Sequence, residues 1–187
     1  MTYLTVIAIV VIIYFVFTYN SLVSIKNNVS KAWANIDVLL KQRHDELPKL
    51  IDTCKRYMQH EQETLEKVIQ ARSGVDHARQ SQDIAGLVVA ESALQGSLGG
   101  LFALAESYPD LKADQSFSAL QSRITGLENA IADRREFYND SVNVNNVRIE
   151  QFPDLIVANL LGFKALNLLA FTPPELEDVD VSKRFNR

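Results

Sequence analysis

The chain begins with an apolar segment, residues 3–19, that contains no charged side chain. As a helix rising 1.5 Å per residue it would span ~25 Å, near the short end of what a bilayer requires. Tyrosines near its ends suit the membrane–water interface. We therefore predict a membrane anchor over residues 1–19. Its lipid-facing side chains include Tyr3, Leu4, Ile7, Val10, Ile13, Phe15, Phe17 and Tyr19.

A cleaved signal peptide is the main alternative to an anchor. It would carry a basic stretch before the apolar run and small residues before the cleavage site, and neither is present. Lys26 and Lys31 follow the segment, whereas no lysine or arginine precedes it. The positive-inside rule therefore favours a single-pass protein whose soluble domain lies in the cytoplasm.

From Leu22 onward, apolar residues recur at intervals of three and four, which is the spacing of one face of an amphipathic helix. No break separates this pattern from the anchor, so we predict one continuous helical rod. The seam of apolar residues keeps its phase to about Ile69. Pro48 interrupts the rod and would either kink it or start a new helix at a corner. The unbroken phase favours a kink.

Three further apolar patterns follow. Ser73 and Gly74 are predicted to close the first region, and Asp83 to cap the next helix. That helix ends before Pro109, and another runs from about residue 117 to 152. Asp154 is predicted to cap the last element, residues 155–171, which is almost uniformly apolar. Such a helix must be buried in the bundle core, against another subunit, or at the membrane surface near the anchor.

No segment shows the alternation of a strand, so the predicted fold is all-α. We expect a transmembrane helix that continues into an antiparallel bundle of three to four long helices plus a short C-terminal helix. The bundle occupies residues 20–171. Residues 172–187 form a charged tail that we expect to be mobile.

Composition excludes several functions. The formal net charge of −4 argues against a nucleic-acid binder, which needs a basic surface. The lone Cys54 rules out an intramolecular disulfide or a multi-cysteine metal site. No glutamate has a histidine three residues later, as a di-iron bundle site requires, and His60-Glu61 lacks the second histidine of a zinc protease motif. We predict no enzymatic activity, no metal and no cofactor.

Two groups of polar residues are candidates for interactions. Charges of both signs flank Pro48, where they could latch a kink, receive a partner, or form a solvated face. Asn145 falls on an apolar seam, where a buried amide can fix the register between helices; the neighbouring asparagines are expected to be surface amides. The full set of candidates is Asp37, Arg43, Asp45, Pro48, His60, Glu61, Tyr138, Asn145, Leu161, Phe163 and Leu168.

Several segments resemble the LemA family of bacterial membrane proteins, in the same order along nearly the whole chain. They include residues 32–38 (AWANIDV), 41–50 (KQRHDELPKL), 101–106 (LFALAE) and 108–113 (YPDLKA). The resemblance implies a membrane-anchored helical domain with no established enzymatic activity, in the bacterial cytoplasmic (inner) membrane. One magnetosome-associated branch of the family is tied to membrane organisation.

These patterns lead to two hypotheses of function. The first is a non-enzymatic scaffold or adaptor, anchored in the lipid bilayer, that forms homo-oligomers and presents helical faces to unidentified protein partners. The alternative is a membrane-surface module that senses or organises lipid through its apolar C-terminal helix.

Overall fold

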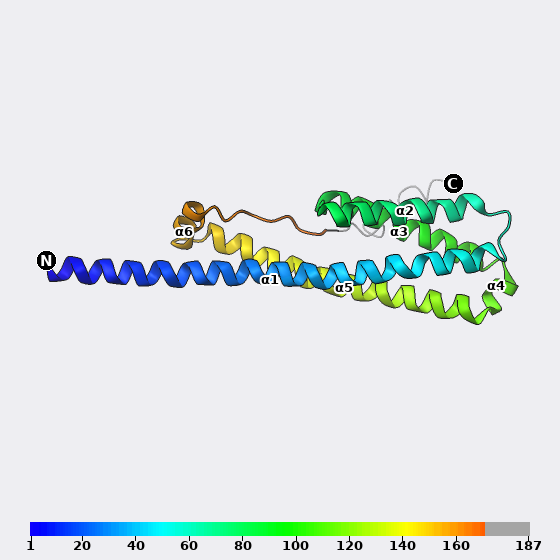
Figure 1. Ribbon diagram of the computed structural model, residues 1–187, viewed down its shortest axis with the longest axis horizontal. Coiled ribbons are helices and arrows are strands. Elements are labelled where there is room, and N and C mark those ends of the chain that lie inside the picture. The colour runs from blue at the N-terminus through cyan, green and yellow to red at the C-terminus, as the bar shows by residue number, and fades with distance from the viewer. Residues whose placement is uncertain (171–187) are drawn as a thin grey trace, which may run out of the picture.

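The computed structural model describes residues 1–170, which form an elongated helical bundle (Figure 1). The all-α prediction is confirmed, since these residues contain helices and no strand. The expected tail, residues 172–187, lies outside the described residues. The helices are α1 (Thr2–Lys55), α2 (Gln62–Ser81), α3 (Ile84–Ala105), α4 (Pro109–Ala113), α5 (Gln115–Glu150) and α6 (Asp154–Leu161).

Helix α1 passes without a break from the apolar segment into the bundle, as the continuous pattern predicted. Pro48 lies inside it, so the chain does not turn a corner there. The prediction that the rod continues to Ile69 was wrong, because the chain turns between Lys55 and Gln62. Met58 explains the error: its side chain is buried in the core from within the turn, so the apolar phase continues although the helix has ended.

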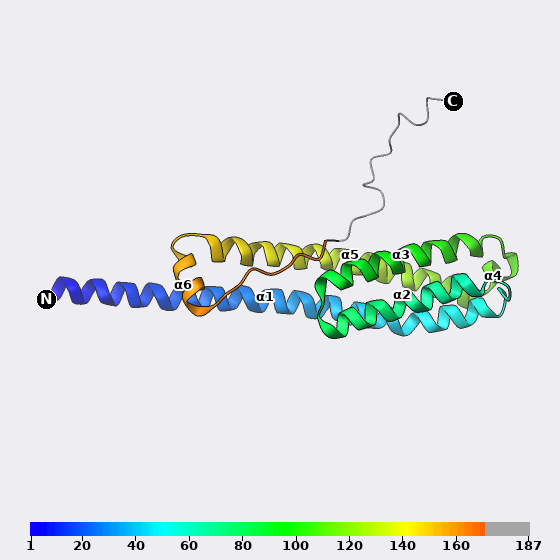
Figure 2. The same cartoon turned by 90° about the horizontal axis from the view of Figure 1, so that it is seen from above.

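Helices α2 and α3 form an antiparallel hairpin over the part of α1 and α5 that is remote from the N-terminus (Figures 1 and 2). Helix α2 runs through Ser73 and Gly74, which were wrongly expected to end it. Packing against α3 outweighs the ~1 kcal/mol that a glycine costs in a helix. The predicted cap at Asp83 is confirmed, because its carboxylate accepts a hydrogen bond from the Gly86 N–H at 3.0 Å.

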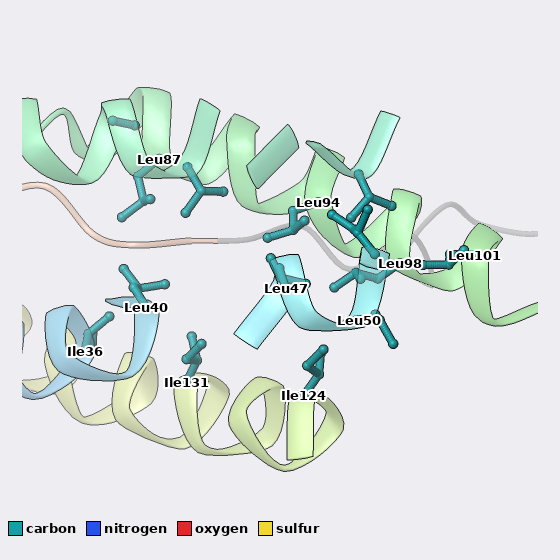
Figure 3. Close-up of a cluster of buried hydrophobic side chains, with 14 of the residues drawn as sticks. Ile36, Leu40, Leu47, Leu50, Leu87, Leu94, Leu98, Leu101, Ile124 and Ile131 are labelled. Atoms are coloured by element: carbon teal, nitrogen blue, oxygen red, sulfur yellow. The ribbon is translucent and has the colours of Figure 1, made fainter. Parts of the chain in front are cut away.

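The core lies where these four long helices meet. Leu47 and Leu50 of α1 point toward leucines of α3 and isoleucines of α5 (Figure 3). Each such side chain contributes about 1.5–3 kcal/mol when fully buried. A smaller cluster near the other end joins α1, α5 and α6, and contains Leu22, Ile149, Val157 and Ala158.

Within residues 1–170, two helices, α1 and α3, are long and apolar enough to cross a membrane. Helix α3 packs against α2 and buries Leu87, Leu94 and Leu98 in the bundle. The first part of α1 differs, because residues 1–17 are all exposed and the N-terminal end of this segment extends beyond every other element (Figures 1 and 2). The burial of α3 is typical of a core helix. The exposure at the start of α1 is typical of an apolar helix that lies outside the bundle.

Cys54 provides a test of the packing at the end of α1. Burial raises the pKa of its thiol to about 11, and only the thiolate reacts readily. At pH 8 we expect the folded protein to react with a disulfide reagent at least ~100-fold more slowly than the urea-unfolded protein. A cysteine introduced at the exposed Val89 should react at the ordinary rate. Rapid modification of Cys54 in native buffer would contradict its burial.

Candidate functional site

The chain after α6 is extended rather than helical. Gly162, in the left-handed region at φ 72°, ends the helix, and the Phe163 N–H donates back to the Ala158 carbonyl at 3.0 Å. Residues 163–170, here called the strap, then run along α5 toward α3 (Figure 2). The prediction of a helix over residues 155–171 was therefore wrong beyond Leu161. A glycine that adopts a positive φ at low cost made the early stop possible.

Asparagine side chains of α5 bind the backbone of the strap. The Asn139 amide donates to the Leu169 carbonyl at 3.2 Å, and its oxygen accepts from the Leu169 N–H at 2.8 Å. Asn146 makes the same pair with Leu166, with both distances 2.9 Å. Asn139 and Asn146 are seven residues apart on α5, which is a helical rise of ~10.5 Å. Leu166 and Leu169 are three residues apart on the extended strap, which spans ~10 Å. The two spacings match, so both asparagines can bind the strap at once. We call this arrangement the amide ladder.

Two predicted candidates extend the amide ladder. The buried Tyr138 hydroxyl donates to the Asn167 carbonyl at 3.2 Å, while its ring packs edge-on against Trp33. The buried Asn145 amide donates to the Lys164 carbonyl at 3.3 Å. Asn145 is buried on the seam, as the sequence predicted, but the hydrogen bond of its amide goes to the strap rather than to another helix.

The sequence interpretation missed Asn139 and Asn146, which were expected to be ordinary surface amides. A signal for them exists: the pairs Tyr138-Asn139 and Asn145-Asn146 are seven residues apart, so they lie on one face of α5. The strap also explains the last part of the apolar segment. Leu169 is buried in the main core, whereas the candidate Leu168 is 43% exposed.

Asp154 fastens α6 to the exposed apolar end of α1. One of its carboxylate oxygens accepts hydrogen bonds from the Tyr14 hydroxyl at 2.7 Å and the Thr18 hydroxyl at 3.4 Å. The other pairs with Nε of Arg148 at 2.5 Å. Asp154 is buried and makes no capping hydrogen bond, so the predicted cap was wrong. We call these four residues the clamp.

Further candidates lie beside the clamp. The Phe163 ring stands edge-on to Tyr19, with centroids 6.5 Å apart, and Leu161 is 42% exposed at the end of α6. Leu161 and Phe163 line a shallow groove with Lys26 and Asn145. The structure thus gathers these candidates at the end of the bundle nearest the apolar segment.

The charges around Pro48 serve the bundle itself. Arg43 is 1% exposed and bridges α1 to Glu91 of α3 and, at 2.6 Å, to Glu128 of α5. Burial disfavours its charge, but the two carboxylates outweigh this and raise the pKa of Arg43. The contacts of Arg43 therefore join three helices of the bundle. Asp45 remains exposed on the surface.

The other candidates lie elsewhere along the bundle. Asp37 pairs with Arg79 of α2 at 3.0 Å. His60 is exposed at the far end, and the Glu61 carboxylate beside it accepts a hydrogen bond from the Tyr108 hydroxyl at 3.0 Å. These residues connect neighbouring elements and do not converge with the amide ladder or the clamp.

Known proteins share this sequence pattern. The profile of the LemA family matches residues 32–182. The chain belongs to the LemA family. Protein LemA of Metamycoplasma hominis is 31% identical over 172 residues, which cover 91% of this chain and 77% of that protein. The family resemblance seen in the sequence is therefore confirmed.

Magnetosome proteins show a shorter similarity to this LemA-family chain. Magnetosome protein MamQ 2 of Paramagnetospirillum magneticum is 32% identical over 85 residues, or 44% of this chain and 31% of the relative. MamQ of Magnetospirillum gryphiswaldense is 31% identical over 78 residues, or 42% and 29%. The chain spans under a third of the length of these two relatives. Together the likenesses indicate a membrane-associated helical protein.

The amide ladder predicts a specific effect on the strap. Replacing both Asn139 and Asn146 with alanine removes four hydrogen bonds to the strap backbone. We expect faster amide hydrogen exchange at Leu166 and Leu169, and a loss of about 2–4 kcal/mol of protection at ~1 kcal/mol per bond. Asn143→Ala on the same helix is the matched control. Unchanged exchange in the double variant would show that the ladder does not retain the strap.

The buried cation predicts a large stability effect. Arg43→Met leaves Glu91 and Glu128 without their shared counter-charge, and the unfolding free energy should fall by ~3–5 kcal/mol. Lys49→Met removes an exposed lysine that pairs with Glu46 on the same helix, and should cost less than ~1 kcal/mol. Urea unfolding in detergent micelles measures both. Equal costs would mean that Arg43 contributes no more than a surface charge.

Proposed function

We propose that the protein is a single-pass membrane protein that acts as a non-enzymatic scaffold, with its bundle in the cytoplasm. The carrying observation is that α1 is one helix from the apolar segment to the far end of the core. The part beyond residue 20 is ~50 Å long, so the bundle would project from the membrane without a flexible linker. Lys26 and Lys31, just beyond the apolar segment, favour the cytoplasmic orientation.

An uncovered face supports self-association. Helices α2 and α3 and the strap lie on one side of the α1–α5 pair, as Figure 1 shows. The opposite side carries a groove in which Phe137 and Val144 are more than half exposed. We call this the outer face. It is lined by Ile25, Asn28, Lys31, Asn35, Phe137, Asp140, Ser141 and Val144.

Membrane anchoring would fix how two copies meet at the outer face. A two-fold axis along the membrane normal keeps both copies at the same height. Helix α1 of each copy then packs antiparallel against α5 of the other, which gives an up-down four-helix arrangement. Lys31 and Asp140 line the same groove, so this symmetry brings Lys31 of one copy to Asp140 of the other.

Substitutions on the outer face test the scaffold. Phe137→Asp with Val144→Asp should weaken dimerisation at least about tenfold, because exposed apolar groups at an interface centre contribute most. Val89→Asp, on the exposed surface of α3, is the matched control. Energy transfer between labelled full-length copies in lipid nanodiscs gives the readout.

A charge exchange sharpens this test. Lys31→Asp and Asp140→Lys should each weaken association, and the double variant should restore it. A protein that is monomeric in nanodiscs at every density would exclude the self-associating scaffold. Photo-crosslinking from position 137 in membranes would then identify any other protein that covers the outer face.

One observation favours the alternative of a membrane-surface module. Phe152, Ile156 and Leu160 are exposed next to the apolar end of α1, in and just before the C-terminal helix. The two roles are compatible, because the outer face and these side chains are different surfaces.

A further inference from the structure

Helix α6 carries apolar side chains on two sides, with Asn159 as a polar residue among its exposed positions, and only one side is covered. Val157 and Ala158 pack against Leu22 and Ile149. The other side carries Ile156 and Leu160, one turn apart and 60% and 73% exposed, and Phe152, which precedes the helix, is 81% exposed. A cluster of exposed large apolar side chains of this kind marks a surface that contacts lipid or another protein.

The clamp sets the position of α6 along α1. Tyr14 and Thr18, which bond to Asp154, both lie inside the apolar segment, and Tyr19 contacts Phe163. If the span ends at residue 19, Tyr14 lies ~7.5 Å inside that end. Interfacial helices are buried ~5–10 Å into the boundary between headgroups and acyl chains, which is the same depth.

The surface of α6 is also continuous with that of the anchor. A hollow beside the clamp is lined by Phe17 of α1 and by Phe152, together with Arg148, Ser21 and Gln151. The exposed rings of Phe17 and Phe152 therefore border the same hollow. Lipid that surrounds the apolar part of α1 would reach α6 across this hollow, where Arg148 and Gln151 can contact headgroups and the two rings can contact acyl chains.

Charges at this level suit lipid headgroups. Arg148 lines the hollow, and Lys26 and Lys164 line the groove next to Gly162. The acidic groups nearby are Asp154, which is buried and paired with Arg148, and the exposed Glu150. Basic side chains at a membrane surface are attracted to lipid phosphates.

We propose that α6 lies in the lipid surface beside the anchor, as a second membrane contact of the same chain. Phe152, Ile156 and Leu160 enter the acyl region, and Arg148 and Lys164 lie at the level of the phosphates. This proposal rests on the proposed membrane crossing of α1. The asparagine-bound strap carries the chain from α6 back to the core of the bundle, away from the bilayer.

A fluorescence experiment on the full-length protein tests this proposal. The only tryptophan, Trp33, is replaced by phenylalanine, and Ile156→Trp places a single reporter on α6. The vesicles are made of phosphatidylcholine brominated near the start of the acyl chain. Emission should fall at least about twofold relative to unbrominated vesicles, because the helix lies ~5–10 Å deep. Leu160→Trp, at a second exposed position, should behave in the same way.

Two further single-tryptophan variants serve as controls. Ile9→Trp reports whether α1 crosses the membrane and should be quenched. Val38→Trp is exposed on the same helix but ~28 Å beyond residue 19, so its emission should not change. Quenching at position 9 without quenching at 156 and 160 overturns the proposal for α6 and leaves the anchor standing. Absence of quenching at position 9 as well overturns the proposed membrane crossing.

Discussion

The contact between α1 and α5 is the interaction on which the other parts of the structure depend. These are the two longest helices, and they lie side by side over most of the bundle (Figures 1 and 2). The α2–α3 hairpin packs on one end of the pair, and α6 and the strap pack on the other. Neither could bury its apolar side chains without the surface that α1 and α5 provide together. The fold is therefore a two-helix spine with two different coverings.

Arg43 lies where the spine meets its first covering. A buried guanidinium loses its hydration, and its ion pairs offset that loss only when their geometry is good. Here one side chain contacts α3 and α5 from α1, so a shift of any of these helices along its axis would separate the charges. Apolar packing alone specifies such a register weakly. Arg43 therefore favours one alignment of the three helices, and the stability lost on its removal comes from the carboxylates that are left without a partner.

The sequence predicted correctly those elements whose physical cause is local or periodic along the chain. Periodicity located the long helices because burial on one face imposes a 3.6-residue repeat. It misplaced the end of α1 because Met58 is buried from a turn, and burial alone does not distinguish a turn from a helix. Asp83 was found because its cap is a local interaction.

The candidate region was harder to predict, because its contacts join distant parts of the chain. Asn139 binds Leu169, thirty residues away, and Asp154 binds Tyr14, 140 residues away. Neither contact leaves a local pattern at its second partner. The apolar composition of residues 155–171 indicated burial correctly for Leu169, but it could not show that Gly162 would end the helix. Tyr138 and Asn145 were recognised because both lie on the apolar seam of α5.

The amide ladder has a consequence for how the sequence of the strap can change over evolution. It recognises N–H and carbonyl groups, so the side chains at positions 166 to 168 are largely free to vary. Proline is the exception at positions 166 and 169, because each of these residues donates its N–H to an asparagine. The side chains of the strap should therefore vary among related proteins while Asn139 and Asn146 stay the same. The constraint on the strap itself would appear as the absence of proline at positions 166 and 169.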